Sequence, residues 1–542
     1  MKRRQFLETS ALAGALALSR PASLLSADKS SKHLPASPKE FELEELTISE
    51  LQSGMQSGKF TSRSMVKKYL DRIDDIDKNG PKLNSVIEVN PDAMVIAEAL
   101  DRERKEKGVR GPLHGIPILI KDNIDTADSM MTTAGSLALV GSRPAQDAYV
   151  AKRLREAGAV ILGKTNLSEW ANFRSSHSTS GWSGRGGQTK NAYVQDRNPC
   201  GSSSGSGAAA AANLCAAAIG TETDGSVVCP SSTNSLVGIK PTVGLIGRSG
   251  IIPISHSQDT AGPMARTVND AAILLGALTG IDADDAVTKT NAGKSFTDYT
   301  QFLIKDGLRG ARLGVARKYF GFNDLVDKLL NDLIAEMKSM GAVIVDPADI
   351  PTSGKFDDSE LEVLLYEFKA DLNNYLGRPR LGRLQVHSLQ DVIDFNEKNR
   401  DRELTYFGQD LFVKAQARGP LTEKKYLQAL ARNHLLSRTQ GIDFVMRKNK
   451  LDAMIAPTGG PAWPTDWING DHFTGGYSSA SAVAGYPHIT VPAGYVFGLP
   501  VGISFFAGAW SEPKLIKYAY AFEQATKARK APRFLSSPEF KS

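Results

Sequence analysis

The sequence has few cysteines. Three in 542 residues, an odd number, argue against a disulfide framework. We therefore expect Cys200, Cys215 and Cys229 to be small buried apolar residues. No group of cysteines and histidines has the spacing of a metal site. No metal or other cofactor is expected.

Long apolar runs and a strong charge of one sign are also missing. No stretch approaches the roughly 20 apolar residues needed to cross a bilayer, so we expect no membrane span after processing. The net charge is +6, and residues 1–27 carry four basic side chains against one acidic one. The remaining chain is nearly balanced, and no basic cluster is interleaved with aromatic residues. This excludes a nucleic-acid partner.

The first residues have the pattern of an export signal. Arg3 and Arg4 precede Phe6-Leu7, and a short apolar run follows over 11–18. This resembles a signal peptide of the twin-arginine type over 1–27, and the alternative is a basic N-terminal helix. We predict an exported, periplasmic protein, with a linker over 28–44.

Apolar periodicity predicts an α/β protein with a central, largely buried sheet. We expect one large domain over 45–535, in which the more charged segment 293–450 is a helical covering region. Helices are predicted over 47–76 with Ser49 as cap, 93–107, 149–157, 208–218 and 231–236, and strands over 115–121, 160–162, 237–240, 252–254, 452–457, 488–493 and 499–506.

Two short motifs suggest other chemistries. Gly158–Thr165 matches the phosphate-loop pattern, but its interior, Ala-Val-Ile-Leu, favours a strand and the residues before it favour a helix. That order argues against nucleotide binding. Gly201–Gly205 matches the G-x-S-x-G elbow of α/β-hydrolases, with Ser203 as nucleophile. An esterase using Ser203 remains an alternative, although no apolar strand precedes the motif. His434, His472 and His488 are its candidate bases.

A longer constellation is more specific. It comprises Gly-Ile-Pro-Ile-Leu-Ile-Lys121, Gly-Ser202-Ser-Ser-Gly, Gly-Thr-Glu-Thr-Asp-Gly-Ser226, Gly238-Ile-Lys-Pro-Thr and Ser257-Gln-Asp-Thr-Ala-Gly-Pro. With these motifs the sequence resembles the amidase signature family, and within it bacterial amidases close to the peptide amidases. The resemblance implies a single domain with a mixed, twisted sheet covered by helices on both faces. It also implies a triad of Lys121, Ser202 and Ser226, with a cis peptide bond at Ser202.

The implied roles agree with the chemistry of the residues. A serine hydroxyl needs an adjacent base, and a lysine can be that base only when burial keeps it neutral. Ser226 would be the nucleophile, Lys121 the base and Ser202 the relay between them. Backbone N–H groups of the turn Thr223-Asp224-Gly225 would face one point and bind the oxyanion. Ser203 would support the site by hydrogen bonding.

The residue two positions after Ser226 is Val228, where many family members carry arginine. We therefore expect a neutral acyl group, with Trp463, Trp467 and Tyr477 as candidate cavity residues. The predicted reaction is hydrolysis of a carboxamide to a carboxylate and ammonia. The substrate would be a small-molecule or peptide amide, and the protein a monomer or homodimer. The alternatives are the glutaminase subunit of a tRNA-dependent amidotransferase and an exported protein with an inactive site.

Overall fold

The computed structural model describes residues 40–381 and 384–540. The predicted signal peptide lies outside these residues. Residues 40–540 belong to one compact unit. Residues 40–44, predicted as the end of the linker, are part of this unit, and Leu43 among them is fully buried. Among the described residues, no helix combines the length and apolar character needed to cross a bilayer.

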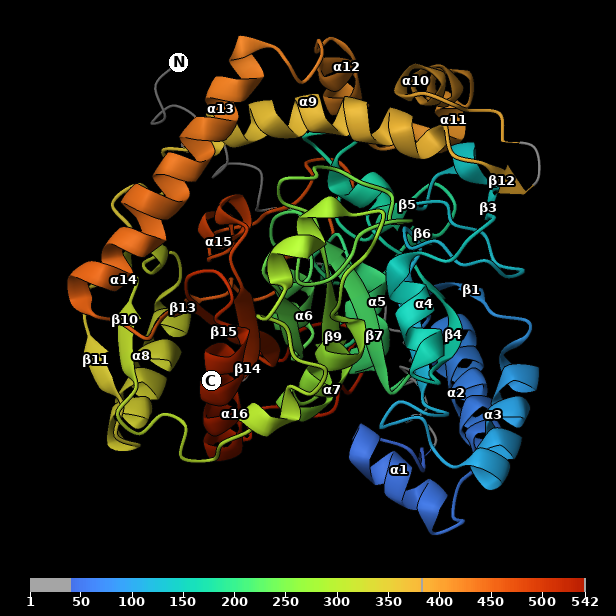
Figure 1. Ribbon diagram of the computed structural model, residues 1–542, viewed down its shortest axis with the longest axis horizontal. Helices are drawn as coiled ribbons and strands as arrows, with labels where there is room; N and C mark the ends of the chain where they lie inside the picture. Colours follow the sequence, from blue (N-terminus) through green and yellow to red (C-terminus); the bar gives the residue numbers. More distant parts are fainter. Residues whose placement is uncertain (1–39, 382–383, 541–542) are drawn as a thin grey trace, which may run out of the picture. The chain divides into compact units, whose positions relative to one another are not determined.

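A mixed sheet of eleven strands forms the centre of the described chain (Figure 1). The pairs β4–β2–β7 and β13–β10–β11 are parallel and the others antiparallel. In spatial order the strands are β1 (Val86–Val89), β4 (Val160–Thr165), β2 (Pro117–Lys121), β7 (Ala217–Glu222), β9 (Thr260–Ala265), β8 (Val237–Lys240), β14 (His488–Val496), β15 (Leu499–Phe506), β13 (Ala453–Pro457), β10 (Arg312–Val315) and β11 (Val343–Val345). Two-stranded sheets join β3 (Arg143–Pro144) to β12 (Arg380–Leu381) and β5 (Trp182–Ser183) to β6 (Gly187–Gln188).

Helices cover both faces of this sheet, which confirms the predicted fold class. The helices are α1 (Ile48–Gln56), α2 (Ser62–Arg72), α3 (Ala93–Lys107), α4 (Tyr149–Glu156), α5 (Ser204–Ala211), α6 (Val228–Thr233), α7 (Val268–Leu278), α8 (Asp324–Ser339), α9 (Asp357–Leu376), α10 (Leu389–Lys398), α11 (Arg400–Glu403), α12 (Asp410–Gln416), α13 (Lys424–His434), α14 (Asp443–Asn449), α15 (Ser479–Ala484) and α16 (Glu512–Thr526). Helix α5 packs on β2, β7 and β9, while α6 packs on β8, β14 and β15.

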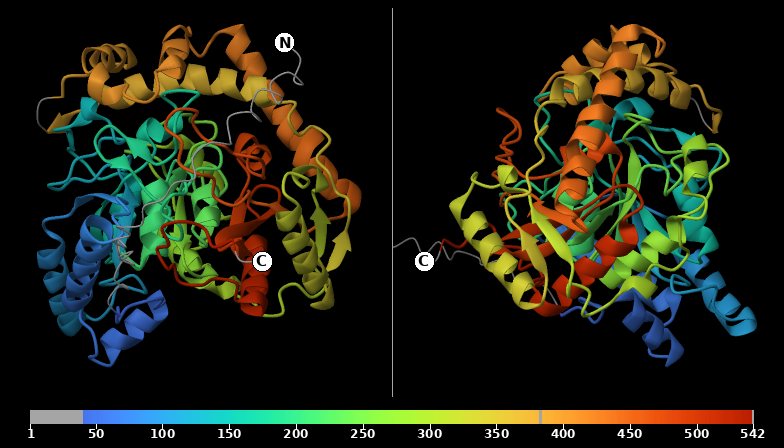
Figure 2. Two further views of the ribbon diagram at one scale, coloured as in Figure 1. Left: turned by 180° about the vertical axis from the view of Figure 1, so that it is seen from behind. Right: turned by 60° about the vertical axis from the view of Figure 1, so that its left-hand side comes forward.

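The segment 293–450 contributes to both the cover and the sheet. Helices α9 to α12 lie along the top in the view of Figure 1, and α13 descends from them on the left; Figure 2 shows the same helices from behind. The strands β10 and β11 of this segment extend the sheet beyond β13. Its apolar side chains pack against the core loops, for example Phe368 against Phe173.

Several predicted elements differ in their bounds. The helix expected over 47–76 is two helices, α1 and α2, with Gly58 between them at a φ of 78°. Thr47, not Ser49, caps the first of them, and its hydroxyl accepts the N–H of Glu50. The helix α6 begins at Val228 and ends at Thr233, three residues before the predicted range in each case.

The helix predicted over 208–218 was wrong in its second half. Helix α5 ends at Ala211, and Asn213 has a left-handed φ of 59°. Ala217 to Ile219 then pair with β2 as part of β7. Alanine itself favours a helix, so pairing with a distant strand decides the conformation here.

The residues of the phosphate-loop pattern form the strand that their apolar interior predicted. Gly158 ends the turn after α4, and Lys164 lies within β4. The Lys164 side chain is buried and donates to the carbonyl of Ile124 and the hydroxyl of Thr132. The segment is therefore a core strand and not a phosphate-binding loop.

Candidate functional site

Lys121 is the last residue of β2, one of the inner strands of the sheet, and its side chain is fully buried. Its Nζ atom donates to Ser202 Oγ at 2.8 Å and to Thr221 Oγ1 at 2.9 Å. Burial lowers the pKa of this amine to about 7, although the nearby carboxylates of Asp259 and Glu222 oppose the shift. The amine is therefore divided between its neutral and charged forms near neutral pH.

Ser202 lies in the loop before α5. The Gly201–Ser202 peptide bond is cis, as the family resemblance implied. A Cβ at residue 201 would collide with the hydroxyl of Ser168, so glycine is required at this close approach. The carbonyl of Ser202 accepts the N–H of Ser168 at 3.0 Å, which holds the loop against the core.

Ser226 lies in the turn between β7 and α6 and is 7% exposed. Its carbonyl oxygen accepts the N–H of Ser203 at 3.2 Å, so the turn and the Ser202 loop are joined through their backbones. Gly225, directly before it, has a φ of 78°, a conformation that favours glycine. The structure thus brings the three predicted triad residues to one place, from positions 121, 202 and 226.

Glu222 organises the turn around Ser226. Its carboxylate accepts the N–H groups of Gly225 at 2.9 Å, Val227 at 2.7 Å and Val228 at 3.0 Å. The prediction that Gly225 offers its N–H to an oxyanion was therefore wrong, because Glu222 already accepts it. The N–H groups of Asp224 and Ser226 have no acceptor among the described residues. Sequence reasoning missed Glu222, although an acidic residue inside an otherwise buried motif was a usable signal.

The turn also carries the polar side chains of Thr223 and Asp224. The Thr223 hydroxyl donates to Asp259 at 2.5 Å, and Asp259 also accepts the N–H groups of Ile254 and Ser255. Burial raises the pKa of Asp259 to about 6. Burial likewise raises the pKa of Asp224, against the hydroxyls of Ser478 and Ser479 that lower it. The side chain of Thr223 thereby ties the turn to the segment 254–259.

Ser203 has a structural position. Its buried hydroxyl donates to the carbonyl of Thr221 at 3.0 Å and accepts the N–H of Thr221 at 3.2 Å. The candidate histidine His488 instead contacts Ser504 Oγ at 2.6 Å, and His472 contacts Asp466. Because the hydroxyl of Ser203 is engaged with a strand, the arrangement does not favour the elbow hypothesis.

A cleft opens onto the loops of Ser202 and Thr223. Residues 252–254, predicted as a strand, are instead irregular, and together with Ile251 they form an apolar wall of this cleft. The N–H of Ile252 donates to the carbonyl of Asn123, so the segment follows the end of β2 and joins no sheet. The farther part of the cleft is polar, and its lining includes Arg248, Asp285, His256, Asp371, Tyr375 and Arg378.

None of the three aromatic residues proposed for the cavity lines this cleft, and each packs on another group. Tyr477 is buried and stacked on Phe506, and Trp467 stacks on Tyr406. Trp463 packs against Cys200 and Cys229. Tyr375 of α9 is the aromatic residue among the described residues that line the cleft.

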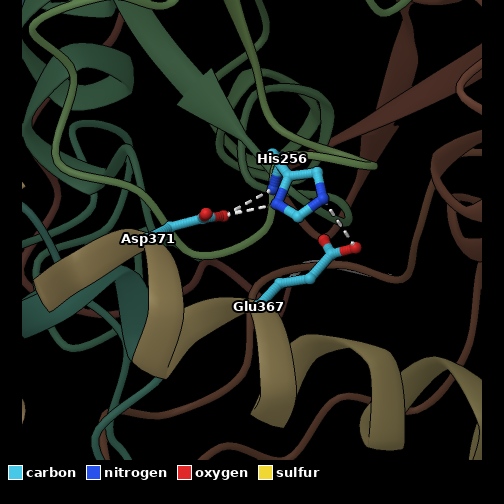
Figure 3. A group of neighbouring side chains, drawn as sticks. All are labelled: His256, Glu367 and Asp371. Atoms are coloured by element: carbon cyan, nitrogen blue, oxygen red, sulfur yellow. Dashed lines mark hydrogen bonds and ion pairs between the residues drawn. The ribbon is translucent and has the colours of Figure 1, made fainter. Parts of the chain in front are cut away.

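At the mouth of the cleft, His256 lies between two carboxylates of α9 (Figure 3). Its Nδ1 is 2.8 Å from Asp371 Oδ2, and its Nε2 is 3.3 Å from Glu367 Oε1. Burial lowers the pKa of the imidazole, but the bond to Asp371 and the charge of Glu367 outweigh it, so the net shift is upward. The three side chains could in principle ligate a metal. Both ring nitrogens, however, face carboxylate oxygens, which is the pattern of a protonated imidazole joining the cleft wall to α9.

Two of the three cysteines form a disulfide, so the prediction for them was wrong. Cys200 and Cys229 are joined, with their Cα atoms 6.0 Å apart, while Cys215 is free and buried as predicted. The low number of cysteines argued against a framework of several disulfides. A single disulfide, however, requires only that two loops carrying cysteines lie side by side. The loop before Ser202 and the first turn of α6 meet because Ser202 and Ser226 do.

Comparison with known proteins gives consistent results. The Amidase family model matches residues 64–516. A protein of Arabidopsis thaliana named as a probable amidase is 46% identical over 506 residues, covering 92% of this chain and 93% of that protein. The native peptide amidase of Stenotrophomonas maltophilia superimposes with a TM-score of 0.87 at 51% identity, covering 91% of this chain and all of that one. One component of the glutamyl-tRNA(Gln) amidotransferase of Pseudomonas syringae is 33% identical over 497 residues, covering 89% of this chain and 98% of that component.

Proposed function

Because this chain belongs to the amidase signature family and is an amide-cleaving hydrolase, we propose that it forms an acyl-enzyme at Ser226. The substrate would be the primary amide at the C-terminus of a peptide, and the products a peptide carboxylate and ammonia.

The contact between Lys121 and Ser202 carries this proposal. When the amine is neutral, the same 2.8 Å contact can take the proton of the Ser202 hydroxyl. Ser202 then takes the proton of Ser226, whose oxygen attacks the amide carbon. A pKa of about 7 allows Lys121 both to accept this proton and to release it near neutral pH.

The rest of the cycle follows from the same groups. The N–H groups of Asp224 and Ser226 would stabilise the negative oxygen of the tetrahedral intermediate. The proton held by Lys121 returns through Ser202 to the amide nitrogen, which leaves as ammonia while the C–N bond breaks. A water molecule then attacks the acyl carbon, loses its proton along the same path, and releases the carboxylate and Ser226.

The choice of substrate rests on similarity and on the cleft. The 51% identity to a peptide amidase spans nearly the whole compact unit. Beside the triad the cleft wall is apolar, at Ile251, Ile252 and Ile254, which suits a neutral side chain next to the amide. Val228 supplies no charge for a substrate carboxylate. The polar outer part could contact the peptide backbone farther from the scissile bond.

The test is ammonia release by the purified chain. Peptide amides with apolar C-terminal residues, simple aliphatic and aryl amides, and free glutamine should be compared at equal concentration, with Ser226→Ala as the matched inactive variant. We expect the highest kcat/KM on peptide amides. A preference for glutamine would favour the glutaminase alternative, and no release from any amide by folded protein would refute the proposed activity.

We also propose that the protein is exported. The proposal is supported by Arg3-Arg4 in the expected signal and by the disulfide, since stable disulfides are typical of oxidising compartments. In a bacterium with a twin-arginine pathway, the full chain should be found in the periplasm and the Arg3→Lys/Arg4→Lys variant in the cytoplasm. Equal distribution of the two would contradict this localisation.

A further inference from the structure

The disulfide joins the two segments that carry the serine pair. Cys200 lies two residues before Ser202, and Cys229 lies three residues after Ser226. The N–H of Cys229 donates to the carbonyl of Gly225 at 2.8 Å, so Cys229 is one helical turn from the Ser226 loop. The bridge therefore closes beside the place where a proton must pass between the two hydroxyls.

The backbone at Cys200 is held in an unfavourable conformation. Its φ is 57°, in the left-handed region that residues with a Cβ rarely adopt. Such a conformation persists when the surroundings impose it. The N–H of Cys200 donates to Asn198 Oδ1 at 2.8 Å, and its carbonyl accepts the hydroxyl of Ser204 at 2.6 Å. The bond to Cys229 attaches the side chain of this residue to the opposite segment.

Other contacts would keep the two segments associated without the bridge. The carbonyl of Pro199 accepts the hydroxyl of Thr233 at 2.8 Å and the amide of Asn234 at 3.1 Å. Trp463 packs against the two cysteines, and its carbonyl accepts the N–H of Asn198. The cysteines are only 5% and 9% exposed. Loss of the bridge should therefore loosen the local geometry while the fold remains.

We propose that the Cys200–Cys229 disulfide is a positioning element that aligns Ser202 with Ser226 for proton transfer. This rests on the proposed function, because alignment matters only if the two serines exchange a proton. A relay works only with hydroxyls held within hydrogen-bonding distance, and a displacement of about 1 Å can cost ~10²-fold in rate. The bridge touches no substrate and acts through the two loops.

The matched experiment uses the same substitution at all three cysteines. Cys200→Ser/Cys229→Ser removes the bridge, and Cys215→Ser changes a buried thiol outside it. With a peptide amide as substrate, we expect the double variant to lose about 10- to 100-fold in kcat with KM within twofold, and Cys215→Ser to retain the kcat of the unmodified enzyme. Circular dichroism would check that both are folded at the assay temperature.

Two outcomes would overturn the inference. One is a folded double variant whose kcat equals that of Cys215→Ser. The other is alkylation of all three cysteines in the unfolded, unreduced chain, since the bridge allows only Cys215 to react. If the unmodified enzyme released ammonia from no amide, the proposed function would be refuted instead. The two failures are therefore distinguishable.

A second measurement covers a double variant that does not fold. The folded Cys215→Ser enzyme is treated with a water-soluble phosphine, which takes up oxygen from water while the disulfide gains two electrons and two protons. Exposed thiols and kcat are followed together. A fall in kcat proportional to the thiols released supports the positioning role, and full kcat after release of both thiols contradicts it.

Discussion

Lys121 donates to Ser202 over 2.8 Å, although 81 residues separate them in the chain. The lysine ends an inner strand, and the serine lies two residues before α5, a helix that packs on the same strand. A base that could titrate near neutral pH is therefore in direct contact with a hydroxyl.

We predict that kcat/KM rises with pH through about 7 and then levels. The folded pKa of Lys121 is about 7, and only the neutral amine accepts a proton. Below this pH the charged fraction grows, and kcat/KM should fall about tenfold per pH unit. Initial rates on one peptide amide from pH 5.5 to 9 would measure this. A flat profile, or a midpoint near the ordinary value of about 10.4, would contradict it.

The two adjacent serines should behave differently. Ser202→Ala removes the contact with Lys121 and should lower kcat by roughly 10³-fold or more. Ser203→Ala removes bonds to Thr221 and should lower kcat by less than about tenfold while reducing stability by about 1–3 kcal/mol. Steady-state kinetics and thermal unfolding of both variants would decide. If Ser203→Ala were the inactive one, the elbow hypothesis would be favoured.

Glu222→Gln should reduce kcat about 10- to 100-fold with little change in KM. The amide NH₂ would face backbone N–H groups that the carboxylate now accepts, so the turn carrying Ser226 would shift. The control is Glu512→Gln, a buried carboxyl that accepts the N–H of Thr242 outside this turn. Equal kcat losses in the two variants would show that the effect is not specific to the turn.

Arg174→Met should destabilise the protein by roughly 3–5 kcal/mol. Arg174 is fully buried, donates to Glu169 and to the carbonyl of Glu403, and lies 3.5 Å from the Glu403 carboxylate. Its loss leaves two buried carboxyls without a cation. The exposed pair of Arg400 and Glu397 is the control, since Arg400→Met should cost no more than about 1 kcal/mol. Denaturant midpoints would compare them, and similar midpoints would contradict the prediction.

His256→Gln should reduce stability at low pH and not at high pH. The folded pKa of His256 is raised, so its contribution is complete below the unfolded value of about 6.5 and is lost as pH rises through the folded value. The side chain is 44% exposed, so the effect should stay below about 1 kcal/mol. Melting temperatures at pH 5.5 and 9 would measure it. His472→Gln, which removes an imidazole paired with Asp466, controls for charge alone. A pH-independent difference would refute the role of the ion pairs.

Local signals determined much of the sheet. The apolar runs ending at Lys121, Pro457 and Phe506 all became strands, because runs of apolar residues bounded by turns can be buried on both faces. The family motifs likewise identified Lys121, Ser202 and Ser226 from the amino-acid sequence alone. Where pairing with a distant strand overrode the local preference, as in the alanine-rich segment after Ala211, the prediction was wrong.

The sequence by itself thus determined the fold class, six of the eleven strands of the central sheet and the three triad residues that meet at the site. Only the tertiary structure decided that Glu222 takes the N–H of Gly225, that 251–254 forms a cleft wall, and that Cys200 is bonded to Cys229. The physical reason is that propensity and periodicity act over a few residues. These contacts depend instead on which distant segments the packing of the sheet brings together.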